Sequence, residues 1–275
     1  MNEQVYDKIG YWSEIKLDII RDYAKAYSGI LHAQRSLMHM YIDAFAGGGL
    51  HISKTSGGYV PGSPQNALLV EPPFAEYHLI DLDKRKVTSL RNLTQGRTDV
   101  FIYQGDCNSI LLNKVFPRVR YEDYKRALCL LDPYGLHLNW DVIFTAGQMR
   151  SIDMFLNFPV QDMNRNVLWR VPENVDLKQA GRMTAFWGDD SWRQAAYDTQ
   201  RNLFGWEEKT DNQSVVDAFR ERLRRVAGFR HVPEPIPMRN SQGAVVYYLF
   251  FASQKPVAEN IVQHIFREYK DRGIR

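Results

Sequence analysis

The sequence predicts an α/β fold built on a doubly wound, mostly parallel sheet. Short apolar runs typical of strands alternate with helical stretches five times between about residues 38 and 160. Polar residues follow each run at its carboxyl end, where sheets of this kind bind their ligands. The fourth run, Ala127 to Leu131, is apolar throughout, as expected for a central parallel strand that is buried on both faces.

Length and composition indicate a globular chain. It has 275 residues, of which 44% are hydrophobic and 24% charged, and we expect residues 1–275 to form a single domain. An apolar run near the ~18 residues that span a membrane is absent. The first four residues, Met1-Asn2-Glu3-Gln4, are unlike a secretory signal. We therefore expect a cytoplasmic protein with no membrane partner.

Charge and cysteine content narrow the possible ligands. The formal net charge of +3 permits a nucleic-acid partner without requiring one. Cys107 and Cys129 stand apart without a C-x-x-C pattern, and no H-E-x-x-H occurs. We therefore expect no cysteine-based metal site and no bound metal.

The first predicted helix covers about residues 11 to 34. Its apolar stripe includes Ile15, Ile19, Tyr23 and Tyr27, and Ser13 is a candidate for its N-cap. Lys16 lies near the start of this helix. It is either a ligand for a carboxylate or an ordinary solvated lysine.

A glycine-rich turn follows the first predicted strand. Asp43 opens a D-x-F-x-G-x-G pattern that contains Phe45, Gly47 and Gly49. Glycine lets backbone approach a bound small molecule because it has no β-carbon. The same pattern also ends ordinary strands, so alone it is a weak indication of a nucleotide-like ligand.

A polar insertion separates this turn from the next helix. Residues 51–62 form either a lid, a substrate contact or a tolerated insertion. The helix is predicted to begin at Pro61-Gly62-Ser63-Pro64, with Ser63 as its cap and Pro64 as its first residue.

The second strand, Glu76 to Ile80, ends in two acidic residues. Asp81 stands where a carboxylate would bind the two hydroxyls of a ribose. Asp83 is a second candidate, with the alternative that it only caps the helix predicted over residues 84–93.

The remaining strands each end in a polar motif. They are predicted at 100–103, 127–131 and 152–156, followed by Gly105-Asp106-Cys107-Asn108, Asp132-Pro133-Tyr134-Gly135 and Asn157-Phe158-Pro159. A helix is expected at 140–149, after the fourth strand.

A helical insert is predicted at 162–231, between strands five and six. Its helices are expected near 177–187, 191–204 and 214–226. Two strands, 232–238 and 244–252, form an antiparallel hairpin, and a helix over 255–270 follows. The run Val245 to Phe251 is too apolar for an edge strand, so we expect it inside the main sheet.

This order of elements resembles the class I S-adenosylmethionine-dependent methyltransferases, which implies a seven-stranded, Rossmann-like sheet with an antiparallel end. By that resemblance, Asp43, Phe45, Gly47 and Gly49 would approach the methionine part of the cofactor. Asp81 would hold the ribose, and Lys16, as a possible ligand for a carboxylate, is a further candidate cofactor contact. Asp106 would meet the adenine amino group, with Cys107 beside the ring.

More closely, the chain resembles the three-Cys-motif partner proteins (TcmP), a bacterial family named for a neighbouring radical-SAM-type protein with three cysteines. The matching motifs are Tyr11-Trp12-Ser13-Glu14-Ile15-Lys16, the Asp43 turn, 61–64, 105–108, 131–136, and Asn157-Phe158-Pro159 followed by Met163-Asn164-Arg165. The resemblance implies Asn157, Asn164 and Arg165 as substrate contacts.

The fourth strand end suggests the reaction. Methylation of an exocyclic base amine needs an acceptor for its hydrogens and an aromatic face for the base. Asp132 and the Pro133 carbonyl would accept, and Tyr134 would stack. The motif departs from the D/N-P-P-Y/F of adenine amino-methylating enzymes and is closer to the D-P-F-G of tRNA guanine-N2 dimethyltransferases. The alternative is a simple strand-ending turn.

Two other functions stay open. The chain is either an enzyme or a partner subunit of the three-cysteine protein, which would use this fold for binding, for example in defence against mobile elements. A dinucleotide oxidoreductase fits less well because Asp43 precedes the glycines. In the insert, five arginines near Phe219 and Phe229 suggest a nucleic-acid surface or a solvated helix face: Arg220, Arg222, Arg224, Arg225 and Arg230, with Arg165, Arg170 and Arg182 upstream.

Overall fold

A computed structural model describes residues 6–198 and 208–272, and its centre is a seven-stranded sheet. The strands are β2 (Met38–Asp43), β5 (Glu76–Asp81), β6 (Val100–Gln104), β7 (Lys125–Leu131), β8 (Ile152–Phe158), β11 (Ile236–Arg239) and β12 (Val245–Ala252). Their order is β11-β12-β8-β7-β2-β5-β6. β2, β5, β6, β7 and β8 run parallel to one another, whereas β12 is antiparallel to both β8 and β11.

This topology confirms the predicted fold class, a mostly parallel seven-stranded sheet with an antiparallel C-terminal hairpin. β12 lies inside the sheet, between β8 and β11, because both of its faces carry apolar side chains that need cover. Successive side chains of a strand point to opposite faces of the sheet. Leu128 and Leu130 belong to one buried cluster, and Ala127, Cys129 and Leu131 to the other.

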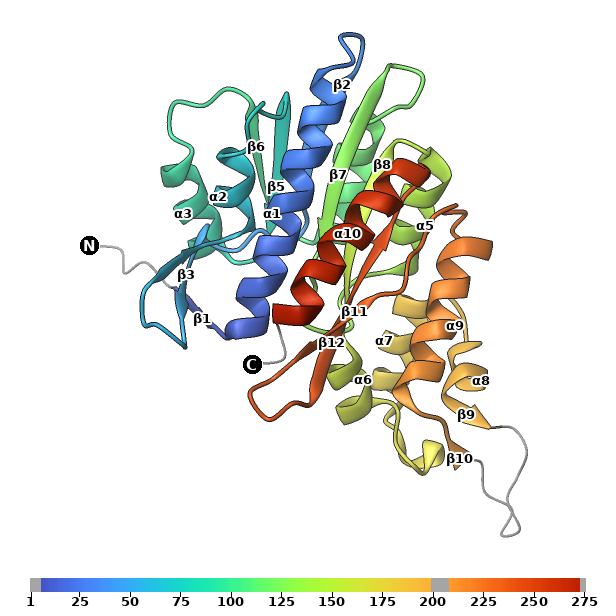
Figure 1. Ribbon diagram of the computed structural model, residues 1–275. Coiled ribbons are helices and arrows are strands. Elements are labelled where there is room, and N and C mark those ends of the chain that lie inside the picture. The colour runs from blue at the N-terminus through green and yellow to red at the C-terminus, as the bar shows by residue number, and fades with distance from the viewer. Residues whose placement is uncertain (1–5, 199–207, 273–275) are drawn as a thin grey trace.

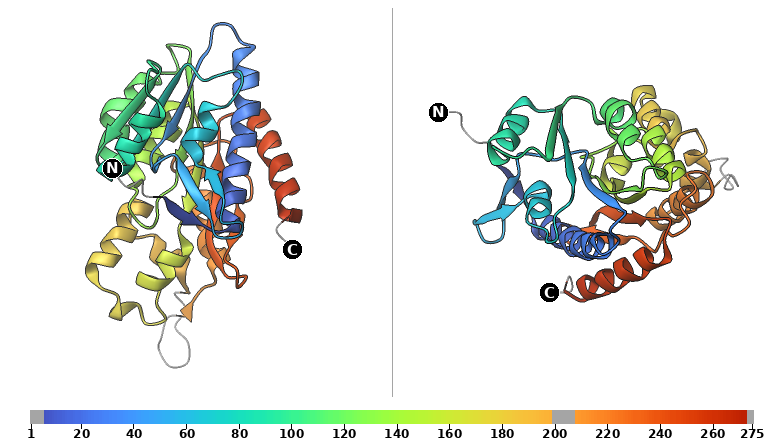
Figure 2. Two further views of the ribbon diagram at one scale, coloured as in Figure 1. Left: turned by 90° about the vertical axis from the view of Figure 1, so that its left-hand side faces the viewer. Right: turned by 90° about the horizontal axis from the view of Figure 1, so that it is seen from above.

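Helices cover both faces of the sheet (Figures 1 and 2). One face packs against α1 (Tyr11–His32), α2 (Ser63–Leu68) and α10 (Pro256–Arg272), and Leu90 of α3 (Lys84–Leu93) belongs to the same cluster. The other face packs against α4 (Cys107–Ile110), α5 (Trp140–Met149) and the helices of the insert. A short π-helical turn at Leu111–Val115 and a 3₁₀ turn at Phe116–Arg118 follow α4.

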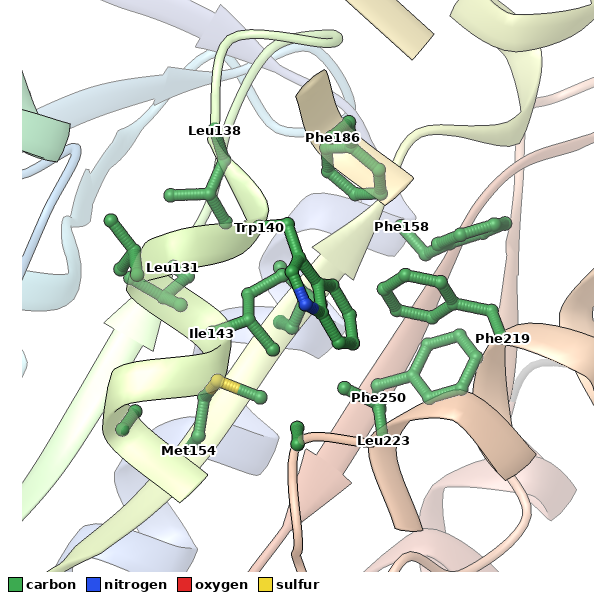
Figure 3. Close-up of a cluster of buried hydrophobic side chains, with 14 of the residues drawn as sticks. Leu131, Leu138, Trp140, Ile143, Met154, Phe158, Phe186, Phe219, Leu223 and Phe250 are labelled. Carbon is green, nitrogen blue, oxygen red and sulfur yellow. The ribbon is translucent and has the colours of Figure 1, made fainter. Parts of the chain in front are cut away.

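The segment between β8 and β11 adds helices to the second face. They are α6 (Val160–Asn166), α7 (Leu177–Trp187), α8 (Trp192–Ala196) and α9 (Asn212–Arg225), with a 3₁₀ turn at Pro172–Asn174 and short strands β9 (Tyr197–Asp198) and β10 (Glu208–Lys209). Figure 3 shows how Phe186 and Phe219 of these helices meet Trp140, Phe158 and Phe250. The insert and the sheet therefore share one core.

Several predicted element ends are wrong. α1 starts after Gly10 and α2 after Gly62, so Ser13 and Ser63 lie inside their helices and do not cap them. The helix predicted at 191–204 ends at Ala196 and is followed by β9, and its predicted last part lies outside the described residues. β11 begins at Ile236, later than the predicted start at Val232.

The polar insertion after the glycine turn is a small sheet. β1 (Asp7–Ile9) pairs in parallel with β3 (Leu50–Ser53), and β3 pairs in an antiparallel manner with β4 (Tyr59–Pro61). The Ser53 hydroxyl donates to Glu14 Oε1 of α1 over 2.7 Å. The insertion is thus fixed to the N-terminal segment and to α1. No helix in the described part of the chain is long and apolar enough to cross a bilayer.

Candidate functional site

The carboxyl ends of β2, β5 and β6 surround a cavity of about 490 Å³, which we call the carboxyl-edge cavity. Because parallel strands end at the same edge of a sheet, residues far apart in sequence meet there. Its lining residues are Ala44, Phe45, Asp81, Leu82, Asp83, Lys86, Gly105, Asp106, Cys107, Tyr134 and His137. The cavity thus brings together Phe45, Asp81, Asp106 and Cys107, four of the residues predicted to bind a cofactor.

The glycine turn contributes Ala44 and Phe45 to the lining of this cavity, whereas Gly47 and Gly49 lie outside that lining. Gly47 and Gly49 have φ angles of 66° and 89°, which side-chain-bearing residues rarely adopt. A β-carbon on Gly49 would also lie 2.7 Å from Leu93 Cδ2. The Gly47 amide donates to Asp81 Oδ2 over 2.9 Å, so the turn is attached to the end of β5.

Asp43 lies beneath the turn, and it is buried. Its Oδ1 accepts the Phe45 amide over 3.2 Å. The pKa of this carboxyl group is raised to about 7, mainly by burial and also by the negative Asp132, although hydrogen bonds from Ser63 and the Phe45 amide oppose the shift. Asp43 therefore shapes the turn from within and does not line the cavity.

The two acidic residues after β5 have different local partners. Asp81 accepts the Gly47 amide through Oδ2 and the Asp83 amide through Oδ1, the latter over 2.8 Å, while its side chain lines the cavity. Asp83 caps α3 by accepting the Arg85 amide over 2.8 Å, and it pairs with the Arg85 guanidinium. Asp83 therefore has the second of its two predicted roles, that of a helix cap.

Asp106 and Cys107 lie together at the end of β6. Asp106 Oδ2 accepts the Ser109 amide over 3.1 Å, and Oδ1 accepts Asn108 Nδ2 over 3.0 Å. Burial raises the pKa of the Cys107 thiol to about 12. The thiol therefore stays protonated near neutral pH and offers an apolar surface to the cavity.

Three elements meet at the mouth of the cavity. Lys86 Nζ of α3 forms an ion pair with Asp7 Oδ2 of β1 over 2.7 Å and lies 5.4 Å from the centroid of the Tyr134 ring. The Tyr134 hydroxyl donates to the same Asp7 oxygen over 3.4 Å, while 76% of Tyr134 stays exposed. An aromatic face is thus available to solvent at the rim.

Lys16 does hold a carboxylate, and that carboxylate belongs to the protein. Its ammonium forms an ion pair with Asp132 Oδ2 and lies 5.2 Å from the centroid of the Tyr247 ring. Burial alone would lower the pKa of Lys16, but the Asp132 and Tyr247 charges raise it above its ordinary value. Lys16 is therefore charged and ties α1 to the end of β7.

Asn157 lies beside Asp132 because Leu156 pairs with Leu131 in the parallel ladder. Its Nδ2 donates to the Pro133 carbonyl over 3.1 Å. Its Oδ1 is buried and has no hydrogen-bond partner among the described residues. A buried acceptor without a partner is costly, so this atom points to a missing donor.

Asn164 and Arg165 lie apart from this centre. Asn164 donates to Asn212 Oδ1 over 2.9 Å and accepts from Lys209 Nζ over 2.8 Å, so it connects α6 with α9 and β10. Arg165 is exposed on α6. The structure therefore does not bring these two predicted substrate contacts to Asp132.

The prediction that phenylalanines join the arginines in a nucleic-acid surface on the insert is wrong. Phe219 and Phe229 are buried in the core. Arg220 Nε and Arg224 Nη2 donate to the Val232 carbonyl over 2.8 and 2.9 Å. These arginines fix α9 to the following loop.

Sequence reasoning missed three lining residues, Leu82, Lys86 and His137. Leu82 had a usable signal, because it stands between the two acidic residues, Asp81 and Asp83, that were predicted to lie at the end of the second strand. Lys86 and His137 stand on a helix and in a loop, where periodicity gives no indication of what they face.

Comparisons with known proteins show similarity in structure but none in sequence family. No family model and no curated protein matches the chain. A Legionella pneumophila protein of the family DUF519 is similar in structure, with a TM-score of 0.54 and 12% identity over 94% of this chain and 93% of the other. A SAM-dependent methyltransferase from Leishmania major has a TM-score of 0.41 and 12% identity over 86% of this chain and 72% of the other. At this identity, the likeness to the Legionella protein shows the fold alone.

Proposed function

We propose that this protein is an S-adenosylmethionine-dependent methyltransferase. The observation that carries the proposal is the carboxyl-edge cavity, which lies at the ends of β2, β5 and β6 in a seven-stranded sheet of the methyltransferase type. Ligands of doubly wound sheets bind in this position. A volume of about 490 Å³ lies within the range of cofactor pockets.

The lining residues fit the parts of such a cofactor. Asp81 presents a carboxylate to the cavity, which suits a ribose diol. Phe45, Leu82 and Cys107 offer apolar surface for an adenine ring, and Asp106 offers an acceptor for its amino group. The cofactor would supply an electrophilic methyl group. The chain would position it and exclude water from it.

We further propose that the substrate is an exocyclic amine of a nucleic-acid base. Asp132 keeps Oδ1 outside the ion pair with Lys16, and Asn157 Oδ1 is a buried acceptor without a protein partner among the described residues. Two neighbouring acceptors suit the two hydrogens of an amine. The exposed Tyr134 ring at the rim is available to stack on a flipped base.

We also propose that the chain is related to the three-Cys-motif partner proteins. Two motifs behind that resemblance, 11–16 and 131–136, are far apart in sequence and join through the ion pair of Lys16 with Asp132. This contact supports a common role for both motifs at one centre.

Isothermal titration calorimetry with S-adenosylmethionine and S-adenosylhomocysteine tests the cofactor. We expect both to bind, and we expect Asp81→Ala to weaken binding at least tenfold. Asp99→Ala is the matched control, because Asp99 pairs with Arg97 just before β6, at the other end of that strand. Absence of binding to both compounds would overturn the proposal.

Methyl transfer to adenine- and guanine-containing oligonucleotides tests the substrate. Asp132→Asn and Asn157→Ala should each reduce transfer while leaving S-adenosylhomocysteine affinity within about threefold. An Asp132→Asn variant that methylates as well as the unchanged protein would remove the catalytic assignment.

A further inference from the structure

A second cavity, of about 480 Å³, lies at the opposite edge of the sheet. It is bordered by the end of α1, the start of α10 and the amino ends of β7 and β8, which lie together in the upper part of Figure 1. We call it the amino-edge cavity. None of its lining residues belongs to the carboxyl-edge cavity.

The amino-edge cavity carries an excess of positive charge. Arg126, Arg150 and Lys255 line it, and none of them forms an ion pair with a carboxylate within residues 6–198 and 208–272. The one acidic residue in the lining is Asp153. Its carboxylate accepts the Tyr23 hydroxyl over 2.7 Å and the Ser253 hydroxyl over 2.5 Å. The cations therefore remain available to an anionic ligand.

Arg126 is held in place before any ligand arrives. Its Nη1 donates to the Tyr121 and Lys125 carbonyls over 3.2 and 2.6 Å. Its guanidinium carbon lies 3.8 Å from the centroid of the Tyr121 ring. A guanidinium fixed in this way loses little conformational freedom when it binds a planar anion or a phosphate.

Backbone strain is concentrated at the same cavity. Within the described residues, Tyr124 and Arg150 are the two non-glycine residues with positive φ, at 56° and 60°. Both line the amino-edge cavity. A residue with a β-carbon is disfavoured in this conformation. Such outliers concentrate at ligand sites, where a particular side chain is needed at that position.

We propose that the amino-edge cavity binds a nucleotide-class ligand, that is, a flat ring joined to a phosphate. Arg126, Arg150 and Lys255 supply the charge that a phosphate needs. Tyr121 and Tyr124 are 38% and 61% exposed, and they provide faces for a ring. The inference is independent of the methyltransferase proposal, because it uses neither the residues nor the edge of that site.

Calorimetry with the four common nucleoside 5′-monophosphates tests the inference. Inorganic phosphate and the free nucleosides serve as separate probes, and saturating S-adenosylhomocysteine is present to occupy the other cavity. We expect at least one monophosphate to bind at least tenfold more tightly than phosphate or its own nucleoside. The titrations are repeated with the Asp81→Ala variant. Because Asp81 lines only the carboxyl-edge cavity, this variant distinguishes monophosphate binding there from binding in the amino-edge cavity, whether or not the methyltransferase proposal holds.

Two substitutions locate the ligand. Arg126→Gln and Arg150→Gly should each weaken monophosphate binding at least tenfold, whereas Arg91→Gln, an exposed position on α3, should leave it unchanged. Arg150→Gly places glycine at a positive φ angle, so its thermal stability should equal or exceed that of the unchanged protein. Loss of binding in that variant cannot then be attributed to unfolding.

Three results would overturn the inference. The first is no monophosphate binding at millimolar concentration. The second is binding that both arginine substitutions leave intact, or that Asp81→Ala abolishes. The third is phosphate binding as tight as that of every monophosphate, which would exclude recognition of a ring.

Discussion

At the scale of single residues, the ionisation of Asp43 beneath the glycine turn makes the stability of the protein depend on pH. Burial raises the pKa of its carboxyl group from 3.8 to about 7. Between these values the folded protein binds more protons at this position than the unfolded chain. The contribution of Asp43 to stability is therefore fully present below about pH 4 and is lost as the pH rises through about 7.

We expect Asp43→Asn to remove this dependence, because the amide stays neutral at every pH. The free energy of unfolding of the unchanged protein should fall relative to the variant by at most about 1.4 kcal/mol per pH unit between about pH 4 and 7. Urea unfolding of both proteins at about pH 5, 6, 7 and 8 measures the difference. Parallel pH profiles would contradict the assigned pKa.

The pair of Lys16 with Asp132 is a second residue-scale test. The two side chains are 10% and 25% exposed. Lys16→Met leaves the carboxylate unpaired and should cost about 2–3 kcal/mol, less than the ~3–5 kcal/mol of a fully buried pair because Asp132 keeps some contact with water. Urea unfolding of Lys16→Met, Asp132→Asn and the double variant completes a cycle. The double variant should cost less than the sum, and strictly additive costs would show that the pair is not coupled.

The individual site residues were predictable to different degrees. Phe45, Asp81, Asp106 and Cys107 converge because each stands just after a strand, and the ends of parallel strands meet at one edge. Lys16 was predicted to bind a carboxylate, but sequence does not distinguish a ligand from Asp132, which is distant along the chain. Only the three-dimensional structure shows which carboxylate such a lysine binds.

At the scale of elements, the loop after β7 depends on a glycine. A β-carbon on Gly135 would lie 2.7 Å from Asp162 Oδ2, and that oxygen also accepts the Leu136 amide over 3.1 Å. The loop that carries Asp132, Pro133 and Tyr134 is thereby held against the start of α6. The close approach, rather than a turn preference alone, explains the glycine in this motif.

Gly135→Ala should therefore destabilise the protein by about 1–3 kcal/mol. The cost should shrink in an Asp162→Ala background, because the clashing oxygen is then absent. Gly181→Ala is the matched control: no atom lies within 4 Å of its added β-carbon, and inside α7 alanine should stabilise by about 0.5–1 kcal/mol. Thermal unfolding of the four variants measures both effects, and equal costs at the two glycines would contradict the packing argument.

The small sheet of β1, β3 and β4 could not be predicted from local pattern. Its strands have three or four residues each, too few for a recognisable alternation. β1 also pairs with β3 across the whole of α1 and β2. By contrast, α3, α5 and α7 have the predicted bounds because apolar spacing and neighbouring turns mark their ends.

At the scale of the whole molecule, the sheet has two independent apolar faces, and the helices on each face determine its core. Phe219 and Phe229 looked like surface aromatics because arginines surround them in sequence. Phe219 is buried because α9 packs against α5 and β12, and Phe229, which follows α9, is buried in the same core, while the arginines reach backbone carbonyls at the edge of α9. The spacing of apolar residues along one helix shows that the helix is amphipathic, but it does not show which element packs against its apolar face.

The shared core predicts that the insert and the sheet unfold together. Phe219 is fully buried, and its ring centroid lies 4.7 Å from that of Phe158 in β8 and 5.5 Å from that of Phe250 in β12. Phe219→Ala should cost about 3–5 kcal/mol and lower the stability of both parts equally. Leu177→Ala, at a position 88% exposed on α7, is the control and should change stability by less than about 0.5 kcal/mol.

Tryptophan fluorescence and far-ultraviolet circular dichroism should report the same urea midpoint before and after the Phe219 substitution. Four of the six tryptophans, among them Trp187 and Trp192, belong to the insert, so fluorescence is weighted towards it, whereas circular dichroism reports the helices of the whole chain. Coincident transitions follow if one core joins the two parts, because neither can expose Phe219 without opening the other. A fluorescence transition that moves to lower urea while the circular dichroism midpoint stays fixed would instead show that the insert unfolds as a separate unit.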